Sequence, residues 1–381
     1  MQATVRDDVS DLIAAMVKQV DTANGELDAR ATYRKAFLRL RAHLSLHPRS
    51  VSRPSLLFES AAQPARLLAA QCLPLATAVV MHLYPLCALQ CVPIPLLSPA
   101  RLKRALLLRD VHQRSLILAN VGGERTQTVD SPLIATATAD GIRIDGTCDY
   151  MSLASVADVV LCRAELADGR GTVLCAVDLR RDSVRIGPWK FGGSMRLSDT
   201  SSVQLVNHHV TRGRYLVVRD RADMQCISAY QRCWFHLFLA DIHLARMERL
   251  RRDWQLPPAS DSIVALNEVG HLRQYSLRLL DDFAPGADIA PLTRCTATLK
   301  LRTSLLAQTM MATLRGSKPL NIGEKERLES AAQELGYIRF QPTSDQKILQ
   351  SLDSTAQNRE QRADGARAWT QGMWFDQRSL R

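Results

Sequence analysis

The sequence changes its pattern twice, at about residue 115 and again at about residue 220. Between these points it consists of short runs rich in Val, Ile and Thr, separated by Gly and Asp, which is typical of β-strands. The runs follow one another too closely for crossover helices, so we expect an antiparallel β domain. On either side, apolar residues recur at helical spacing. The pattern therefore predicts an α+β protein with a central β domain between two helical parts.

These two changes also set the expected domain boundaries. Residues 1–114 are predicted to form a helical N-terminal domain, residues 115–219 the β domain, and residues 220–340 a C-terminal four-helix bundle, with 341–381 as an extension or tail. Helical periodicity first runs without a break from residue 1 to about 48. Further helices are expected at 54–69, 73–90, 99–113, 223–254, 259–282, 289–315 and 323–336.

The clearest turn signal lies in the stretch LIATATADGIRIDG, where Asp140-Gly141 separates two alternating segments. Asp-Gly is a favoured dipeptide for a two-residue hairpin turn, so we expect a hairpin with these residues at its tip. The second strand of this hairpin ends at Tyr150-Met151-Ser152, a small polar stretch before the next apolar run.

Charge and cysteine content limit the classes of partner. The formal net charge of +11 favours anionic partners such as nucleotide phosphates, coenzyme A, an acidic carrier protein or nucleic acid; a solvated basic surface is the alternative. Nine cysteines without a C-x-x-C pair or a leader sequence indicate free thiols in the cytoplasm and no metal site. The apolar stretch 67–97 contains prolines and is predicted to form buried helices, not a membrane span.

Two strand segments carry a resemblance to a known family. The segment IDGTCDYMSLASVAD, residues 144–158, aligns without a gap with the acyl-CoA dehydrogenase superfamily pattern N-G-x-K-x-W-I-T-N-x-x-x-A-D. The later segment GSMRLSDTSSVQLVNHHVT resembles the superfamily pattern G-x-R-x-S-x-T through Arg196, Ser198 and Thr200. The order of helices, strands and helices is also that of the superfamily. The resemblance implies its fold, with a helical N-terminal domain, a central antiparallel β domain and a C-terminal four-helix bundle.

The same resemblance implies a cofactor site. Tyr150 and Ser152 stand where the superfamily has the Trp and Thr that line the flavin, and Thr128 is the best match for the Ser of its flavin segment. In RRDWQLP, Arg251 matches the Arg that reaches the flavin pyrophosphate of a neighbouring subunit. The cofactor implied is FAD, with FMN or no cofactor as alternatives. A homodimer or homotetramer is implied as well.

The usual catalytic Glu of the superfamily has no counterpart that we find. Its Y-E-G-T segment is not matched, and the other known location, within residues 228–244, contains no Glu. Residue 262, where the superfamily has a Gln, is Ser. We therefore assign no catalytic residue. The remaining candidate bases are interpreted as solvated surface carboxylates, namely Glu268, Asp281, Asp282, Asp345 and Asp353.

The function implied is flavin-linked oxidation of a coenzyme A- or carrier-bound acyl thioester, or a related small metabolite, in a specialised biosynthetic pathway in the cytoplasm. Two alternatives remain open. A flavin-dependent monooxygenase or N-hydroxylase of the same fold needs no catalytic Glu. A degenerate homologue without cofactor is expected to act as a redox-neutral enzyme, a scaffold or a nucleic-acid-binding protein, although the sequence lacks a dense Lys run or a Gly-Arg repeat.

Overall fold

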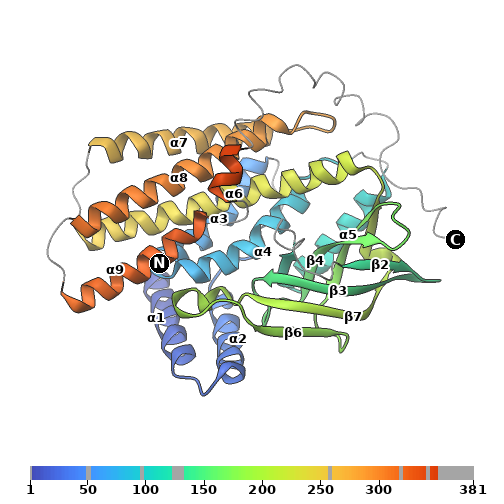
Figure 1. The fold of residues 1–381 in the computed structure, drawn as a ribbon, viewed down its shortest axis with the longest axis horizontal. Coiled ribbons are helices and arrows are strands. Elements are labelled where there is room, and N and C mark those ends of the chain that lie inside the picture. The colour runs from blue at the N-terminus through green and yellow to red at the C-terminus, as the bar shows by residue number, and fades with distance from the viewer. Residues whose placement is uncertain are drawn as a thin grey trace.

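The computed structural model describes residues 2–48, 53–94, 98–121, 133–255, 260–316, 321–339 and 344–350. Along the chain, helices α1–α5 come first, strands β1–β8 follow, and helices α6–α9 come last. In Figure 1 the sheet lies on one side of the molecule and helices α6–α9 on the other, with α4 between them. The predicted α+β architecture is confirmed.

The N-terminal helices are α1 (Gln2–Asp21), α2 (Glu26–Ala42), α3 (Pro54–Gln71), α4 (Leu73–Cys91) and α5 (Pro99–Gln113). The unbroken helical region expected from residue 1 to 48 is wrong, because the chain turns between α1 and α2. Gly25 has φ of 91°, a left-handed value that glycine adopts readily and that ends a right-handed helix. The two helices then pack against each other and reach down beside the sheet (Figure 1).

The strands form one sheet, in the order β6-β7-β3-β2-β4-β5-β8, with β1 paired to β4. Their bounds are Leu118–Val121, Ile134–Ala137, Gly141–Met151, Val159–Leu166, Thr172–Asp178, Val184–Trp189, Ser201–Thr211 and Tyr215–Val218 for β1 to β8. The sheet is mixed, since β4 runs parallel to both β1 and β2. The parallel pairing of β2 with β4 arises from the connection between β3 and β4. Instead of forming a hairpin, the chain crosses from β3 to the opposite side of β2, where β4 begins. This connection begins at Ser152, directly after Tyr150-Met151.

The expected hairpin joins β2 to β3, but its turn is shifted. The Thr138 N–H donates to the Gly141 carbonyl at 3.0 Å, so Ala139 and Asp140 form the tip. Gly141 serves a different purpose: a Cβ there would lie 2.2 Å from the Val210 carbonyl oxygen of β7. Glycine is required at this position because β3 and β7 approach closely.

The C-terminal helices are α6 (Arg221–Asp253), α7 (Ser260–Asp281), α8 (Ala290–Gly316) and α9 (Ile322–Gly336), close to the predicted ranges. The side chain of Asp220 caps α6, and Asn321 and Glu324 form a capping box at the start of α9. Helix α6 packs against α3, α4 and α8, so it is the central helix of the bundle.

Helix α4 joins the bundle to the sheet. Fifteen of its nineteen residues are buried, which identifies it as a core helix that is apolar all round. It is long and apolar enough to cross a membrane, but 83% of its most apolar window is buried inside the fold. It packs against α3 and α6 on one side and β1 on the other. The prediction of buried helices in this stretch is confirmed.

One buried histidine links three segments around α4. The Leu118 N–H donates to Nδ1 of His82 at 2.9 Å, so the ring proton must sit on Nε2, which donates to the Leu46 carbonyl at 2.9 Å. Burial, reinforced by the neighbouring His47, lowers the pKa of His82 to about 3. The ring therefore works as a neutral connector between the N-terminal helices, α4 and β1.

Acidification is expected to destabilise the fold through His82. The unfolded chain takes up a proton on this ring below about pH 6.5, whereas the folded chain does so only near its lowered pKa, so stability falls as the pH drops through this window. His82→Gln keeps an acceptor and a donor but does not titrate. Urea unfolding at several pH values should show a steeper loss for the wild type, by up to about 1.4 kcal/mol per pH unit. Parallel pH profiles for the two proteins would contradict this.

Candidate functional site

The stretch Tyr150-Met151-Ser152 lies at an irregular point of the sheet. The pairing of β3 with β7 shifts register between Cys148 and Met151, and Tyr150 has φ of 59°. Left-handed backbone is uncommon for an aromatic residue and is kept only where the surroundings hold it. The side chain of Tyr150 is consequently turned out of the strand and is 37% exposed.

Asp199 holds the connection that follows this turn. Its carboxyl group is fully buried and accepts hydrogen bonds from the N–H and Oγ of Ser155 at 2.8 and 2.6 Å, and from Nε1 of Trp189 at 2.8 Å. Two backbone bonds, from Leu153 and Ala154, end on the carbonyls of residues 198 and 199. Burial raises the pKa of Asp199, while the bonds from Ser155 and Trp189 act in the opposite direction. The β3–β4 connection is thus fixed to the end of the β6–β7 connection.

A chain of hydroxyl groups runs beneath the turn. Ser198 Oγ donates to the Met195 carbonyl at 2.8 Å, which uses its only proton. Thr200 Oγ1 must therefore donate to Ser198 at 2.8 Å, and Ser152 Oγ must donate to Thr200 at 2.9 Å. Ser152 is buried, with 3% exposure. Because its hydroxyl proton is already donated to Thr200, Ser152 can only accept a further hydrogen bond.

The ring of Tyr150 is bordered by two side chains from the β6–β7 connection. Phe191 lies 6.1 Å away, centroid to centroid, at an interplanar angle of 31°. Lys190 Nζ lies 5.7 Å from the ring centroid and pairs with Asp149 at 3.1 Å. On its other side Phe191 meets the ring of Tyr337, edge to face, at 6.0 Å. The site therefore combines aromatic surface and a cation where the sheet meets the end of α9.

Helix α2 supports the site from below. Arg30 Nη2 donates to the Gly187 carbonyl and to Ser201 Oγ, both at 2.7 Å. Tyr33 is fully buried, and its hydroxyl donates to the Leu197 carbonyl at 3.2 Å. The N-terminal helices thus fix the two ends of the β6–β7 connection that carries Lys190 and Phe191.

The other predicted cofactor residues lie elsewhere. Thr128 is outside the described residues. Arg251 lies in the last turn of α6, which runs from the sheet side to the far end of the bundle (Figure 1). No contact joins it to Tyr150 or Ser152 within the described part of the chain. The turn thus brings Tyr150 and Ser152 together, whereas Arg251 stands apart from both.

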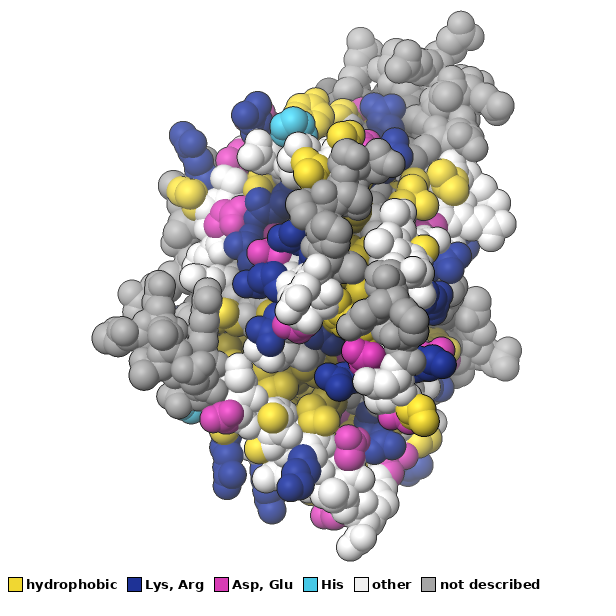
Figure 2. All heavy atoms as spheres, turned by 90° about the vertical axis from the view of Figure 1, so that its left-hand side faces the viewer, with side chains coloured by type: hydrophobic (Ala, Val, Ile, Leu, Met, Phe, Trp, Pro, Cys, Tyr) yellow, Lys and Arg dark blue, Asp and Glu magenta, His cyan; other side chains and the backbone are white. Residues whose placement is uncertain are grey.

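Figure 2 views the end of the bundle at which α6 ends. On this surface Lys and Arg are interspersed with Asp and Glu.

Two of the carboxylates interpreted as solvated surface groups are engaged inside the fold, so that interpretation is wrong for them. Asp345 pairs with the fully buried Lys300 at 2.5 Å and accepts from Ser304 Oγ at 2.7 Å. Asp281 accepts from the N–H and Oγ of Ser55 at 2.8 and 2.6 Å. Both carboxylates connect elements and are unsuited to act as bases.

Glu268 pairs with Arg302 on the surface of the bundle, as an exposed carboxylate should. Asp353 lies outside the described residues. Sequence reasoning missed another carboxylate, Asp223, in the first turn of α6. It is 6% exposed, and burial, helped by the neighbouring Asp220, raises its pKa to about 6. No hydrogen bond or ion pair joins its carboxyl group to another described residue.

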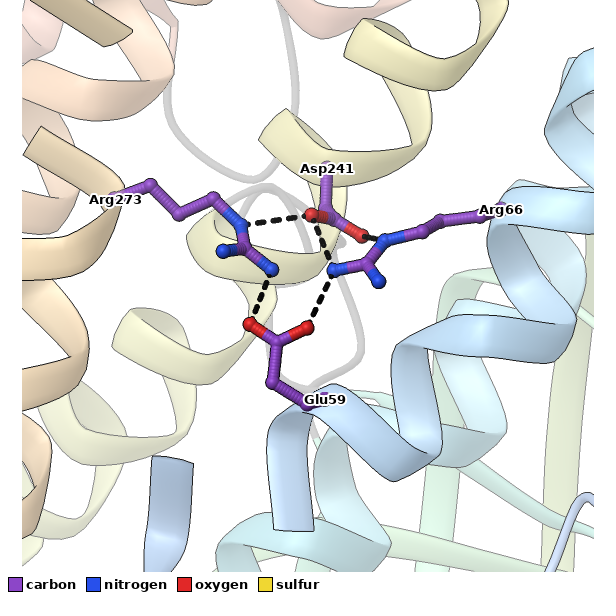
Figure 3. Close-up of polar contacts among 4 residues, drawn as sticks. All are labelled: Glu59, Arg66, Asp241 and Arg273. Atoms are coloured by element: carbon purple, nitrogen blue, oxygen red, sulfur yellow. Dashed lines mark hydrogen bonds and ion pairs between the residues drawn. The ribbon is translucent and has the colours of Figure 1, made fainter. Parts of the chain in front are cut away.

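A closed group of four charges holds α3, α6 and α7 together (Figure 3). Asp241 of α6 accepts from Nε of Arg66 at 2.5 Å and from Nε of Arg273 at 2.9 Å. Glu59 completes the ring, pairing with Arg66 at 2.9 Å and with Arg273 at 2.6 Å. Asp241 is buried in the middle of α6, and both of its carboxylate oxygens accept hydrogen bonds from these arginines.

Sequence reasoning also missed the residues that shape the Tyr150 site, namely Trp189, Lys190, Phe191, Asp199 and Tyr337. One signal pointed to Asp199, since it stands between Ser198 and Thr200, the two matched positions of the second motif. Metal-ligating side chains do not gather at the site: within the described ranges, no three His, Cys, Asp or Glu residues lie close enough to hold a metal ion.

No family model matches the chain, and no curated protein matches it in sequence. Solved structures do. FkbI, for biosynthesis of the methoxymalonyl extender unit of Fk520, superposes with a TM-score of 0.66 at 15% identity, over 93% of this chain and 98% of FkbI. Butyryl-CoA dehydrogenase from Megasphaera elsdenii gives 0.66 at 11% identity, with 93% and 98% covered. Methanesulfinate monooxygenase MsuC from Pseudomonas fluorescens gives 0.67 at 14% identity, with 93% and 96% covered.

These superpositions cover nearly the whole length of each protein, so they include both the helices and the sheet. Identities of this size establish a common fold. The two strand motifs around Tyr150 and Asp199 indicated the same architecture, and the chain has the acyl-CoA dehydrogenase fold.

Proposed function

We propose that this protein is a flavin-dependent oxidoreductase that holds its cofactor against the Tyr150 turn. The observation that carries the proposal is the turn itself: a left-handed aromatic residue, partly exposed, is held by a buried network at the position that the sequence motif assigns to flavin. Two proteins of the same fold are flavoproteins by description. One is an FAD-dependent dehydrogenase, and the other is KijD3, whose structure was solved in complex with FMN. FAD and FMN are both compatible with this site.

The residues around Tyr150 suit a flavin. The Tyr150 ring supplies aromatic surface for the planar ring system, and the Lys190 ammonium supplies positive charge beside it. Ser152, whose proton is committed to Thr200, accepts a hydrogen bond from a ring N–H of the cofactor. When bound, the flavin supplies the two-electron chemistry. The protein side chains bind and orient it and exclude water.

The remaining cofactor contacts are assigned to residues at a distance. In this proposal Thr128 binds the flavin near its ring. Where the flavin is FAD, Arg251 reaches its pyrophosphate in a second subunit, which requires a homodimer or homotetramer. The location of Arg251 at the far end of α6 supports a role across a subunit boundary. Nine free cysteines support a cytoplasmic location.

For the substrate we propose an acyl thioester, carried by coenzyme A or a carrier protein, or a related small metabolite of a biosynthetic pathway. Among proteins of the same fold, butyryl-CoA dehydrogenase is named for a coenzyme A thioester, and FkbI is described as serving the biosynthesis of a methoxymalonyl extender unit. The net charge of +11 suits a phosphate-bearing partner such as coenzyme A. The sequence has no dense Lys run or Gly-Arg repeat to indicate a nucleic acid.

The second candidate is a flavin-dependent monooxygenase, favoured by the state of the buried carboxylates. Asp241 and Asp199 are fully occupied by hydrogen-bond donors, so neither is free to remove a proton from a substrate. Asp223 is buried and makes no hydrogen bond or ion pair with another described residue, so it is the carboxylate to test as the base of a dehydrogenase. Anaerobic bleaching of the bound flavin by an acyl thioester, lost in Asp223→Asn, supports the dehydrogenase. Bleaching only by an external reductant, with oxygen needed for turnover, supports the monooxygenase.

Replacing both Tyr150 and Ser152 with Ala is expected to abolish flavin uptake, because the variant lacks both the aromatic wall and the hydroxyl acceptor. The measurement is flavin retained after gel filtration, quantified by its visible absorbance. Tyr150→Phe keeps the ring and should retain uptake. Tyr275→Ala removes another exposed tyrosine, 54% exposed on α7, and serves as the control. Normal uptake by the double variant would rule out the Tyr150 turn as the flavin site.

A further inference from the structure

Phe191 lies at the end of a short segment that leaves the sheet. The last ladder bond of this region runs from the Lys190 N–H to the Thr200 carbonyl at 2.8 Å. Phe191 follows, then Gly192 and Gly193, and the chain enters a short 3-10 helix, Gly193–Ser198. Phe191 thus stands between two fixed points, the Lys190 ladder bond and the 3-10 helix whose N-cap is Gly192.

The two glycines behind Phe191 have different reasons to be glycine. Gly193 has φ of 56°, a conformation that favours glycine. Gly192 has φ of −100°, and a Cβ at this position would meet no atom within 4 Å. Neither backbone conformation nor space requires a glycine at residue 192. What glycine adds there is freedom of the backbone next to Phe191.

The ring of Phe191 lies between two other rings. It is half-buried, tilted against Tyr150 on one side and edge-on to Tyr337 on the other. An aromatic pair of this kind is weak enough to open at ordinary temperature. Lys190, which also borders Tyr150, is held in place by Asp149 and by its ladder bond. The Phe191 side chain has no polar atom, so it can move aside without breaking a hydrogen bond or an ion pair.

We propose that Phe191 is an aromatic gate, hinged at Gly192, that determines which planar ligands reach the ring of Tyr150. In the closed position Phe191 takes part of the stacking surface of Tyr150. In the open position it swings away from Tyr150, and a planar ligand takes its place. The proposal rests on the proposed function for the identity of the natural ligand, the flavin, but the gate itself can be measured without it.

The first test measures access to Tyr150 directly. Tyrosine nitration by tetranitromethane is followed at each residue by peptide mass spectrometry, with Tyr275 as internal reference. Phe191→Ala is expected to raise nitration of Tyr150 roughly twofold to tenfold. This is the factor by which losing one aromatic pair increases the population of molecules with an uncovered Tyr150 ring. Gly192→Ala is expected to lower it, because the hinge is stiffened. Gly213→Ala is the matched control: a Cβ there also meets nothing within 4 Å, and Gly213 lies beyond the C-terminal end of β7, whereas Gly192 precedes the strand.

The second test separates the gate from the flavin proposal. Stopped-flow mixing with FAD or FMN should give faster association for Phe191→Ala and slower association for Gly192→Ala than for the wild type. If no variant takes up flavin while the nitration pattern holds, the gate stands and the proposed cofactor fails. If nitration of Tyr150 is the same in the wild type, Phe191→Ala and Gly192→Ala, the gate is refuted, whatever the flavin result.

Discussion

Asp241→Ala is expected to lower the free energy of unfolding by about 3–5 kcal/mol, the cost of removing the buried partner from a charge pair. The variant keeps Arg66 and Arg273, whose side chains are 33% and 18% exposed, with only Glu59 left to balance them (Figure 3). Glu59 itself is 43% exposed. Two guanidinium groups then face each other across the position of the missing carboxylate, between α3, α6 and α7. Chemical unfolding followed by circular dichroism measures the loss.

Two further variants make this result specific. Glu59→Gln removes the exposed carboxylate of the same group and should cost about 1 kcal/mol or less, since solvent screens it. The triple variant Arg66→Met, Asp241→Leu, Arg273→Met replaces three of the four charges by apolar side chains, leaves only the exposed Glu59, and should recover most of the loss. An Asp241→Ala variant within about 1 kcal/mol of the wild type would show that the four charges are not coupled as the distances indicate.

Asp199→Ala is expected to cost about 3–4 kcal/mol and to remove flavin uptake. Three donors, from Ser155 and Trp189, lose their acceptor in a fully buried position, and each unsatisfied group costs about 1–3 kcal/mol before local relaxation. Asp199 also has φ of 49°, which Ala tolerates less well than Asp or Asn. The β3–β4 connection is then no longer held, and with it the position of Tyr150.

Asp199→Asn is the matched control. Asn keeps one oxygen for Ser155 and accepts the left-handed backbone, but its amide faces the Trp189 Nε1–H, so a loss of about 1–2 kcal/mol is expected. Flavin uptake should be weakened and not abolished. If Asp199→Ala unfolds at the same denaturant concentration as the wild type, the buried network does not hold the turn. If it is less stable but takes up flavin normally, the turn is not the cofactor site.

Much of the fold could be predicted because its pattern is periodic. The helices after residue 220 and the buried stretch around α4 were placed to within a few residues by spacing alone. The break at Gly25 was missed because the helical pattern continues on both sides of it. The Asp140-Gly141 turn was misplaced by one residue because Gly141 is there for the approach of Val210, a contact between distant parts of the chain.

The site was predicted only where a linear motif carries it. Tyr150 and Ser152 stand in such a motif. Asp199 lies between two matched positions of the second motif but was missed, because its role depends on contacts with Ser155 and Trp189 that no motif records. Lys190, Phe191 and Tyr337 come together from the β6–β7 connection and the end of α9, a juxtaposition that no local pattern records. The engaged state of Asp345 depends on a lysine forty-five residues away in the chain.

The central claim, that this protein is a flavoprotein of the acyl-CoA dehydrogenase fold, is tested most directly by the visible spectrum of the purified protein. The spectrum is recorded as isolated and again after incubation with FAD or FMN and removal of free flavin. We predict the absorption bands of bound oxidised flavin, with one of the two flavins retained in proportion to protein. A folded protein that remains colourless after incubation with both flavins would contradict the claim.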